Sequence, residues 1–281
     1  MSYYKIRSYA KINLALNVIG KSGSLHRIES LISFLDLHDE IYIKKTKNKD
    51  HEIKFIGRFA DGINSKNTVY TLLKIIDTKK LLRKNKFRIT IKKNIPSKSG
   101  LGGGSMNAAT ILKFLIKKKL IKISNKKMKV ITSLIGSDVI LGMYARNLVL
   151  KSNNIIKVLG NKKKIHVLVV KPNFGCSTKK IYSKVKNYKK PQFKRFSKKM
   201  LSFEFLKKMN NDLELIALSK YRNLNNLKKF LENLSEVEFA RMTGSGSAII
   251  AYFKTAKMCK EGEKKVKKHF RNYWCKSSIT I

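Results

Sequence analysis

The sequence of 281 residues predicts an α+β protein with two lobes. A chain of this length can form two hydrophobic cores. Helical segments accompany strands that are joined by short turns, which fits helices packed on an antiparallel sheet. Three stretches carry the prediction: an alternating segment at 9–18, a glycine-rich turn at 96–109 between a strand and a helix, and a strand, glycine turn and strand at 238–253.

The first strand alternates apolar and polar side chains over residues 9–18. Because successive side chains of a strand point to opposite faces, Lys11 and Asn13 are expected to lie side by side, with Asn17 on the same face. A lysine that faces solvent is the alternative interpretation. A polar turn then leads to His26, and two further strands are expected at 28–37 and 40–43.

Three elements follow in the first half of the chain. The apolar spacing of residues 68–82 predicts a helix, with Asn67 as its N-cap. Residues 87–92 alternate as a half-buried strand, and residues 126–134 form a short helix. That helix ends before Asp138, which precedes an apolar run. Asp138 is either a turn residue or a carboxylate held at a dry cleft, where it acts as a base.

Polarity rises around residues 155–165, and the lobe boundary is expected there, with lobes at 1–160 and 161–281. The second lobe is predicted from its apolar runs and turn residues. Its expected elements are a buried strand at 166–170, a loop at 172–178 that caps a helix, three helical segments up to about residue 234, strands at 238–242 and 247–253, a basic helix, and a last strand at 277–281.

The glycine-rich stretch is the main candidate for a binding site. It lies between the strand at 87–92 and a helix whose apolar face includes Ala108 and Leu112. Glycines let backbone N–H groups approach a phosphate, and the first helical turn has unpaired donors and a partial positive charge. The stretch lacks the ending of a P-loop and the surroundings of a dinucleotide fingerprint. A phosphate site is predicted, and a flexible surface loop is the alternative.

Net charge is the unusual feature of the composition. The 63 Lys and Arg residues exceed the 17 Asp and Glu residues, which gives a formal charge of +46. Clustered basic residues bind nucleic acid, but these lysines are spread along the chain and accompany abundant Asn and Ile, which share A/T-rich codons. We therefore interpret the charge as compositional, with a field that attracts anionic substrates.

The apolar runs and the cysteines indicate the compartment. The longest runs, such as residues 167–170, are too short to cross a bilayer, and the first residues lack the apolar core of a signal peptide. Three cysteines, Cys176, Cys259 and Cys275, show no metal-ligand spacing and are expected to be reduced thiols. A cytoplasmic protein without a membrane partner is predicted.

Three stretches, in this order and spacing, resemble the superfamily of galactokinase, homoserine kinase, mevalonate kinase and phosphomevalonate kinase. They are Ser8–Leu14, Pro96–Ala109 and Met242–Gly246. The first stretch, residues 136–139 and residues 211–214 are similar to the branch that acts on 4-diphosphocytidyl-2-C-methyl-D-erythritol. The resemblance implies a two-lobed small-molecule kinase fold. Its N-terminal nucleotide-binding lobe would be ribosomal protein S5 domain 2-like, and its C-terminal substrate lobe would be ferredoxin-like.

The resemblance also implies catalytic roles. Asp138 would be the base that takes the proton of the substrate's 2-hydroxyl, and Lys11 would lie beside it and offset charge on the transferred group. ATP is the implied cofactor, with Mg²⁺ expected alongside it, although no protein ligands of a metal are identified. The ATP phosphates would be bound by the stretch Pro96, Ser97, Lys98, Ser99, Gly100, Leu101, Gly102, Gly103, Gly104, Ser105 and Met106. Lys98 either adds a phosphate contact or faces solvent.

The substrate residues implied by the resemblance come from four segments. His26 would hydrogen-bond the cytosine, Thr178 would contact a phosphate, and Tyr182 would stack on the base, with ordinary packing as the alternative for Tyr182. Asn13 and Thr243 would lie near the reacting groups. Many relatives carry an aromatic residue where this chain has Leu25, so weaker cytidine binding is expected here.

The predicted function is therefore ATP-dependent phosphorylation of 4-diphosphocytidyl-2-C-methyl-D-erythritol in the non-mevalonate route to isoprenoids. A related kinase for another alcohol, of the homoserine or mevalonate type, is the first alternative. An RNA-binding protein is the second, but it leaves Lys11, Asp138 and the glycine-rich stretch unexplained, and no aromatic-basic stacking motif accompanies it. The expected partner is a small-molecule substrate rather than nucleic acid, and the chain acts as a monomer or a homodimer.

Overall fold

The computed structural model of the chain describes residues 3–23, 25–151, 155–159, 164–193 and 196–281. The chain folds into two compact units that are interleaved along the sequence. Unit 1 comprises residues 1–10, 37–97 and 102–145, and unit 2 comprises residues 11–36, 98–101 and 146–281. Two long strands, β1 (Tyr4–Ser22) and β2 (Leu25–Thr46), pair with each other and contribute residues to both units.

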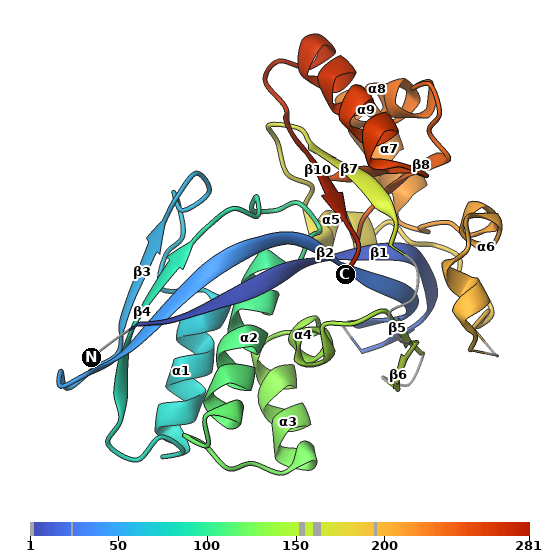
Figure 1. The fold of residues 1–281 in the computed structure, drawn as a ribbon. Helices are drawn as coiled ribbons and strands as arrows, with labels where there is room; N and C mark the ends of the chain where they lie inside the picture. The colour runs from blue at the N-terminus through green and yellow to red at the C-terminus, as the bar shows by residue number, and fades with distance from the viewer. Residues whose placement is uncertain (1–2, 24, 152–154, 160–163, 194–195) are drawn as a thin grey trace. The chain divides into compact units, whose positions relative to one another are not determined.

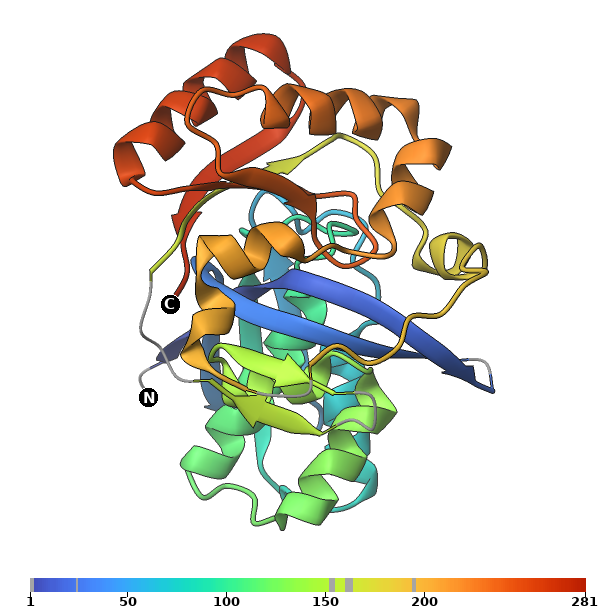
Figure 2. The ribbon, with the colours of Figure 1, turned by 90° about the vertical axis from the view of Figure 1, so that its right-hand side faces the viewer.

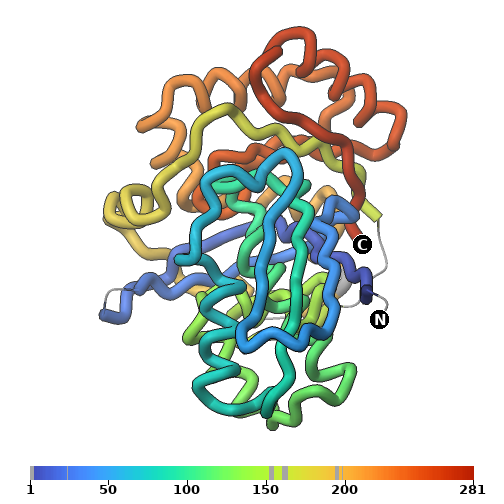
Figure 3. The backbone as a smooth tube through the Cα atoms, turned by 90° about the vertical axis from the view of Figure 1, so that its left-hand side faces the viewer, coloured from blue at the N-terminus to red at the C-terminus, as the bar shows by residue number. Residues whose placement is uncertain are grey.

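Unit 1 combines strands and helices. The end of β2 pairs antiparallel with β4, which pairs parallel with β3, so that these three strands run side by side (Figure 3). Helices α1, α2 and α3 lie next to one another in Figure 1 (cyan to green). The elements are β3 (Glu52–Ile56), α1 (Thr68–Thr78), β4 (Lys86–Lys92), α2 (Gly103–Lys117), α3 (Asn125–Ile135) and α4 (Val139–Tyr144).

The core of unit 1 forms where the apolar faces of α1 and α2 meet the sheet. Leu72 and Ile76 of α1 and Ile111 of α2 are fully buried with Ile41 and Ile91 of the strands. Asn67 caps α1 by accepting hydrogen bonds from the N–H groups of residues 69 and 70, as the sequence predicted. The apolar faces of both helices are therefore buried within this unit.

Unit 2 contains a four-stranded antiparallel sheet in the order β10-β7-β9-β8, in which Val169 of β7 pairs with Ile250 of β9. Figure 2 shows α8 and α9 (orange and red) covering one face of this sheet. The start of β2 pairs with β5, and β5 pairs with β6. The strands are β5 (Leu148–Leu150), β6 (Ile156–Val158), β7 (His166–Lys171), β8 (Phe239–Met242), β9 (Ile249–Phe253) and β10 (Trp274–Ile279).

The helices of unit 2 follow the predicted order. Their buried faces supply Leu224, Leu227 and Leu231 from α8 and Val266 from α9 to a core that includes Leu168. Within the described residues, no helix is both long and apolar enough to cross a membrane. The helices are α5 (Thr178–Tyr182), α6 (Phe203–Lys208), α7 (Glu214–Lys220), α8 (Arg222–Glu232) and α9 (Ala256–His269), with a 3₁₀ turn at Lys198–Leu201.

Two local predictions are corrected by the structure. The strands expected at 28–37 and 40–43 are one strand, β2, because Asp39 is fully buried and hydrogen-bonded there instead of forming a turn. The apolar run after Asp138 is a helix, α4, whereas the sequence predicted no element there. The predicted lobe boundary between residues 160 and 161 lies outside the described residues, and it stays a prediction.

Candidate active site

The first part of the candidate site is the start of α2 in unit 1. Gly102 has a φ of 70° in the left-handed region, and helix α2 begins at Gly103 with no acidic residue in its first turn. A Cβ on Gly104 would lie 3.2 Å from the hydroxyl of Thr68, which donates a 2.6 Å hydrogen bond to the Gly104 carbonyl. The start of α2 therefore lies against the start of α1, where only a small residue fits.

Asp39 holds the chain that leads into the glycine-rich stretch. Its buried carboxylate accepts hydrogen bonds from the backbone N–H groups of Asn94 (2.7 Å) and Ile95 (2.8 Å). Asn107 of α2 donates a third bond of 3.0 Å, and the buried ammonium of Lys93 forms an ion pair with the same carboxylate. One carboxylate thus links β2, the end of β4 and helix α2, and charge-assisted bonds of this kind are strong when buried.

Asp138 directly precedes α4, also in unit 1. Its side chain is half-buried and makes no capping hydrogen bond to α4. Helix α4 packs closely on α2, since a Cβ on Gly142 would lie 2.5 Å from Cβ of Ala109 and 3.1 Å from Sδ of Met106. Asp138 is therefore held near the N-terminal turns of α2, on which the predicted phosphate site depends.

Lys11 and Asn13 lie side by side on β1 in unit 2, as the alternation predicted. The buried Lys11 ammonium donates a 2.8 Å hydrogen bond to Oδ1 of Asn13. The amide of Asn13 donates to the hydroxyl of Ser30 at 2.7 Å, and Ser30 donates to the carbonyl of Ala15 at 2.6 Å. Burial of both side chains excludes the alternative of a lysine that faces solvent.

The middle of the glycine-rich stretch, residues 98–101, packs within unit 2 against β1 and the turn after β8. The N–H of Lys11 donates to the Leu101 carbonyl at 3.0 Å, and the N–H of Ala248 donates to the Ser99 carbonyl at 3.1 Å. Gly100 has a φ of 78°, and a Cβ there would overlap the carbonyl oxygen of Thr243. These contacts bring Lys11, Gly100 and Thr243 together.

The turn between β8 and β9 is fixed from two sides. Asn211 is buried and donates 2.8 Å hydrogen bonds to the carbonyls of Met242 and Gly244. The hydroxyl of Thr243 accepts a 3.0 Å bond from the N–H of Asn13, and the hydroxyls of Thr178 and Ser245 are 2.7 Å apart. Hydrogen bonds therefore link two predicted substrate residues, Asn13 of β1 and Thr178 of α5, to this turn.

His26 and Tyr182 form a second group in unit 2. Their ring centroids are 5.0 Å apart, with 38° between the ring planes. Burial, with a smaller contribution from the charge of Lys21, lowers the pKa of His26 below its ordinary value, so its imidazole is neutral near pH 7. A neutral imidazole offers one donor and one acceptor to a ligand.

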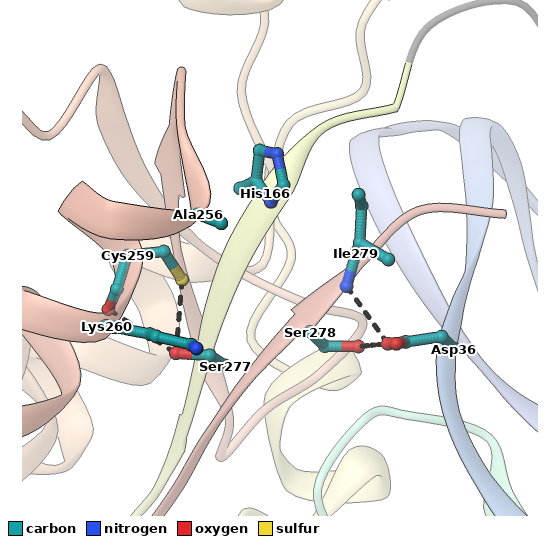
Figure 4. A pocket seen from close by; sticks show the side chains of 8 residues that line it. All are labelled: Asp36, His166, Ala256, Cys259, Lys260, Ser277, Ser278 and Ile279. Carbon is teal, nitrogen blue, oxygen red and sulfur yellow. Dashed lines mark hydrogen bonds between the residues drawn. The ribbon is translucent and has the colours of Figure 1, made fainter.

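A shallow pocket of about 240 Å³ lies elsewhere in unit 2, between α9, β7 and β10 (Figure 4). Asp36, His166 and Cys259 are among its lining residues, and none of the predicted site residues lines it. The Cys259 thiol is 3.3 Å from the hydroxyl of Ser277, and burial raises the pKa of this thiol. A protonated, buried thiol is a poor nucleophile.

Sequence reasoning missed several side chains that support the site. Asp39, Lys93 and Ser30 are buried polar residues that no motif indicated, and Asn211 was noted only as part of a family match. The signal that could have identified Asp39 is a charged residue inside a segment that otherwise alternates as a strand. Lys11 lies in unit 2 and Asp138 lies in unit 1, and the pairing of their side chains stays a prediction.

Comparisons with known proteins concern the fold and the family. The family described as GHMP kinases N terminal domain matches residues 67–144, which include α1, α2 and Asp138. Among solved structures, a crystal structure of 4-(cytidine 5'-diphospho)-2C-methyl-D-erythritol kinase superposes with a TM-score of 0.78 at 19% identity, covering 99% of this chain and 100% of that chain. An L. major mevalonate kinase in complex with R-mevalonate superposes with a TM-score of 0.70 at 14% identity, covering 99% and 95%. The predicted α+β kinase fold is thereby confirmed.

Two relatives carry the comparison further. A 4-diphosphocytidyl-2-C-methyl-D-erythritol kinase of Clostridium tetani is 30% identical over 283 residues, covering 98% of this chain and 100% of the relative. A kinase with the same description from Pelagibacter ubique is 54% identical over 281 residues, covering all of both chains. Identity at this level over the full length shows family membership, which the motifs had predicted. This chain belongs to the 4-diphosphocytidyl-2-C-methyl-D-erythritol kinase family.

Proposed function

We propose that this chain transfers the γ-phosphoryl group of ATP to the 2-hydroxyl of 4-diphosphocytidyl-2-C-methyl-D-erythritol, a step of the non-mevalonate route to isoprenoid precursors. The observation that carries the proposal is the 54% identity, over the full length of both chains, to the Pelagibacter ubique kinase named for this substrate. The buried Lys11 and Asn13 and the glycine-rich start of α2 provide the residue types that this chemistry needs.

In the proposed reaction, the 2-hydroxyl oxygen forms a bond to the γ-phosphorus while the bond from that phosphorus to the bridging β–γ oxygen breaks. ADP is the leaving group, and the hydroxyl proton moves to the carboxylate of Asp138. The ammonium of Lys11 offsets the charge on the transferred group. The protein contributes mainly positioning and charge stabilisation, as in other phosphoryl transfers.

The ATP phosphates are proposed to bind along residues 96–106. Helix α2 has 15 residues, and its first turn has unpaired N–H groups and the positive end of the helix dipole. Glycine at 103 and 104 lets the helix begin close to Ile95 and Thr68, since a Cβ would lie 3.1 Å and 3.2 Å from these side chains. Lys98 has an exposed side chain in this stretch, which leaves it accessible to a phosphate oxygen.

Mg²⁺ is proposed to enter with ATP. Within the part of the chain that the structure describes, no group of three or more His, Cys, Asp or Glu side chains could hold a metal ion by itself. Magnesium in kinases is held by one or two carboxylates together with phosphate oxygens and water, so a site of this kind does not require three clustered side chains. When bound, Mg²⁺ would neutralise charge on the β- and γ-phosphates.

The alcohol substrate is proposed to bind along unit 2. Asn13 and Thr243 would orient the methylerythritol part, Thr178 would hydrogen-bond the diphosphate, and His26 and Tyr182 would contact the cytosine. The 2.7 Å contact between the Thr178 and Ser245 hydroxyls supports a shared polar site for an anionic group.

The test is an ADP-release assay with purified protein, MgATP and each candidate alcohol. We expect turnover with 4-diphosphocytidyl-2-C-methyl-D-erythritol to exceed turnover with homoserine or mevalonate by at least a hundredfold in kcat/KM, on the order of 3 kcal/mol of transition-state discrimination. Phosphorus NMR of the product locates the new phosphate on the 2-oxygen. Faster turnover of homoserine or mevalonate would overturn the substrate assignment while leaving the kinase chemistry in place.

A further inference from the structure

A third aromatic ring lies beside His26. The ring centroid of Tyr188 is 6.3 Å from that of His26, with 52° between the ring planes. The ring centroid of Tyr182 is 5.0 Å from that of His26, so His26 neighbours both tyrosines. Separations of 4.5–7 Å are those of interacting aromatic pairs. Three rings from β2, α5 and the segment after α5 therefore gather in unit 2.

Tyr188 is accessible, unlike most aromatic residues of unit 2. Tyr188 is 46% exposed, and Leu25, which precedes His26, is 72% exposed. Tyr182 is half-buried because it packs against the core of unit 2. Each partly exposed ring offers an apolar face, and a planar base binds such a face by stacking.

The segment that carries Tyr188 has no helix or strand, yet it is fixed to β1. The N–H of Lys189 donates a 3.0 Å hydrogen bond to the carbonyl of Val18. The Lys189 ammonium forms a 2.6 Å ion pair with Asp212, and Asp212 accepts a 2.8 Å bond from the N–H of Val18. Tyr188 is therefore next to a residue that is tied to the strand through both its backbone and its side chain.

A second anchor fixes the segment to β2. The fully buried carboxylate of Glu29 accepts hydrogen bonds from the N–H groups of Gln192 (2.7 Å) and Phe193 (3.4 Å). The amide of Asn17 donates to the side chain of Gln192 at 3.2 Å. Glu29 lies three residues from His26 on β2. Its buried carboxylate therefore fixes the segment that carries Tyr188 to the same strand as His26. Such preorganisation lowers the entropy cost of binding.

We propose that Tyr188 is a base-binding residue that forms, with His26 and Tyr182, a three-ring platform for the pyrimidine of a cytidine diphosphate-linked substrate. The inference rests on the proposed function and deepens it. Tyr188 supplies an aromatic contact that the exposed aliphatic side chain of Leu25 does not supply. The residue sets base affinity and takes no part in phosphoryl transfer, so it acts on substrate KM rather than on kcat.

The experiment measures binding of CDP, the probe, to the full chain by calorimetry. Tyr188→Leu removes the ring and keeps an apolar side chain, whereas Tyr188→Phe keeps the ring. We expect Tyr188→Leu to weaken CDP binding about five- to tenfold and Tyr188→Phe to stay within about twofold of wild type. Tyr3→Leu is the matched control, because Tyr3 is 48% exposed and lies in unit 1. Pyrophosphate, which lacks a base, should bind equally to all four proteins.

Kinetics provide the second measurement. Tyr188→Leu should raise the KM of the cytidyl substrate by the same factor and leave kcat and the KM of MgATP unchanged. Unchanged CDP affinity in Tyr188→Leu overturns the proposal, and so does an equal loss in Tyr188→Phe or in the affinity for MgATP. If wild-type protein neither binds CDP nor phosphorylates the cytidyl substrate, the proposed function itself fails. That outcome is distinct from an active wild type whose CDP affinity is unchanged by Tyr188→Leu.

Discussion

The side-chain amide of Asn107 on α2 donates a 3.0 Å hydrogen bond to the buried carboxylate of Asp39 on β2. The same carboxylate accepts the N–H groups of Asn94 and Ile95, which precede the glycine-rich stretch, and pairs with Lys93. A single side chain therefore sets both ends of the stretch that we expect to bind the ATP phosphates.

Asp39→Asn should weaken MgATP binding and lower stability. The change leaves the buried ammonium of Lys93 without its carboxylate, which costs about 3 kcal/mol or more in comparable buried pairs. We expect urea unfolding to shift to lower concentration and the KM of MgATP to rise more than tenfold, with the KM of the alcohol substrate unchanged. Asp77→Asn is the control, because Asp77 pairs with Lys86 in the same unit. Equal KM values for MgATP in the two variants would contradict the positioning role.

Asp138→Asn and Lys11→Ala should each abolish most turnover. The amide of Asn cannot accept the hydroxyl proton, and general-base catalysis contributes about 10²–10⁴ in rate. We expect kcat to fall by at least a hundredfold in each variant while the affinity for ATP stays within a few fold, measured by single-turnover kinetics and by calorimetry. Near-normal rates in Asp138→Asn would remove Asp138 from the role of base.

Gly100→Ala should disrupt the site more than a matched glycine substitution elsewhere. Gly100 and Gly62 have φ values of 78° and 74°, so alanine has a similar backbone cost of about 1 kcal/mol at both positions. A Cβ at Gly62 meets nothing within 4 Å, whereas a Cβ at Gly100 overlaps the Thr243 carbonyl oxygen. We therefore expect a larger loss of unfolding free energy and a strong loss of kcat/KM in Gly100→Ala alone. Similar behaviour of both variants would show that the Thr243 contact is unimportant.

Stability should fall as the pH is lowered through the ordinary pKa of histidine. Burial, opposed in part by the Asp77 carboxylate, lowers the pKa of His51 below 6.5 in the folded chain. Between that lowered value and 6.5 the unfolded chain binds a proton that the folded chain does not, so the free energy of unfolding decreases with falling pH. Urea unfolding from about pH 8 to about pH 5 should show a shallower decrease in His51→Gln. An unchanged slope would contradict this assignment.

Leu25→Tyr should strengthen binding of CDP. An added aromatic contact beside His26 is worth on the order of 1 kcal/mol, or about fivefold in affinity. If Tyr188 supplies the corresponding contact in the wild type, the gain from Leu25→Tyr should be larger in the Tyr188→Leu background. Calorimetry of the two single variants and the double variant measures this coupling. No gain in either background would contradict the expected effect of Leu25.

The sequence predicted those elements whose apolar periodicity matches their burial. The helix face of α2 and the alternation in β1 were evident, because each element buries one continuous face. Asn67 and the glycine-rich turn were evident because capping and left-handed backbone require particular residues. For the same reason Lys11 and Asn13 were correctly placed side by side.

The missed features depend on long-range contacts. Aspartate is depleted in strands, but Asp39 continues β2 because Asn94, Ile95 and Asn107, 55 to 68 residues away, supply its hydrogen bonds. Helix α4 has only six residues, too few for a periodic pattern, and its position depends on packing against Met106 and Ala109. Tyr188 stands in a segment without periodicity that is fixed by Val18 and Glu29. Local patterns carry no information about such partners.

Both compact units are assembled from three separated pieces of chain, since residues 11–36 and 98–101 belong with the C-terminal half. No single cut yields an intact unit, so a truncated fragment would lack strands or loop residues of its own core. Exchanging halves with a relative would likewise create two hybrid cores at once. Changes to this chain are therefore better made at individual side chains than by transplanting a contiguous half of the protein.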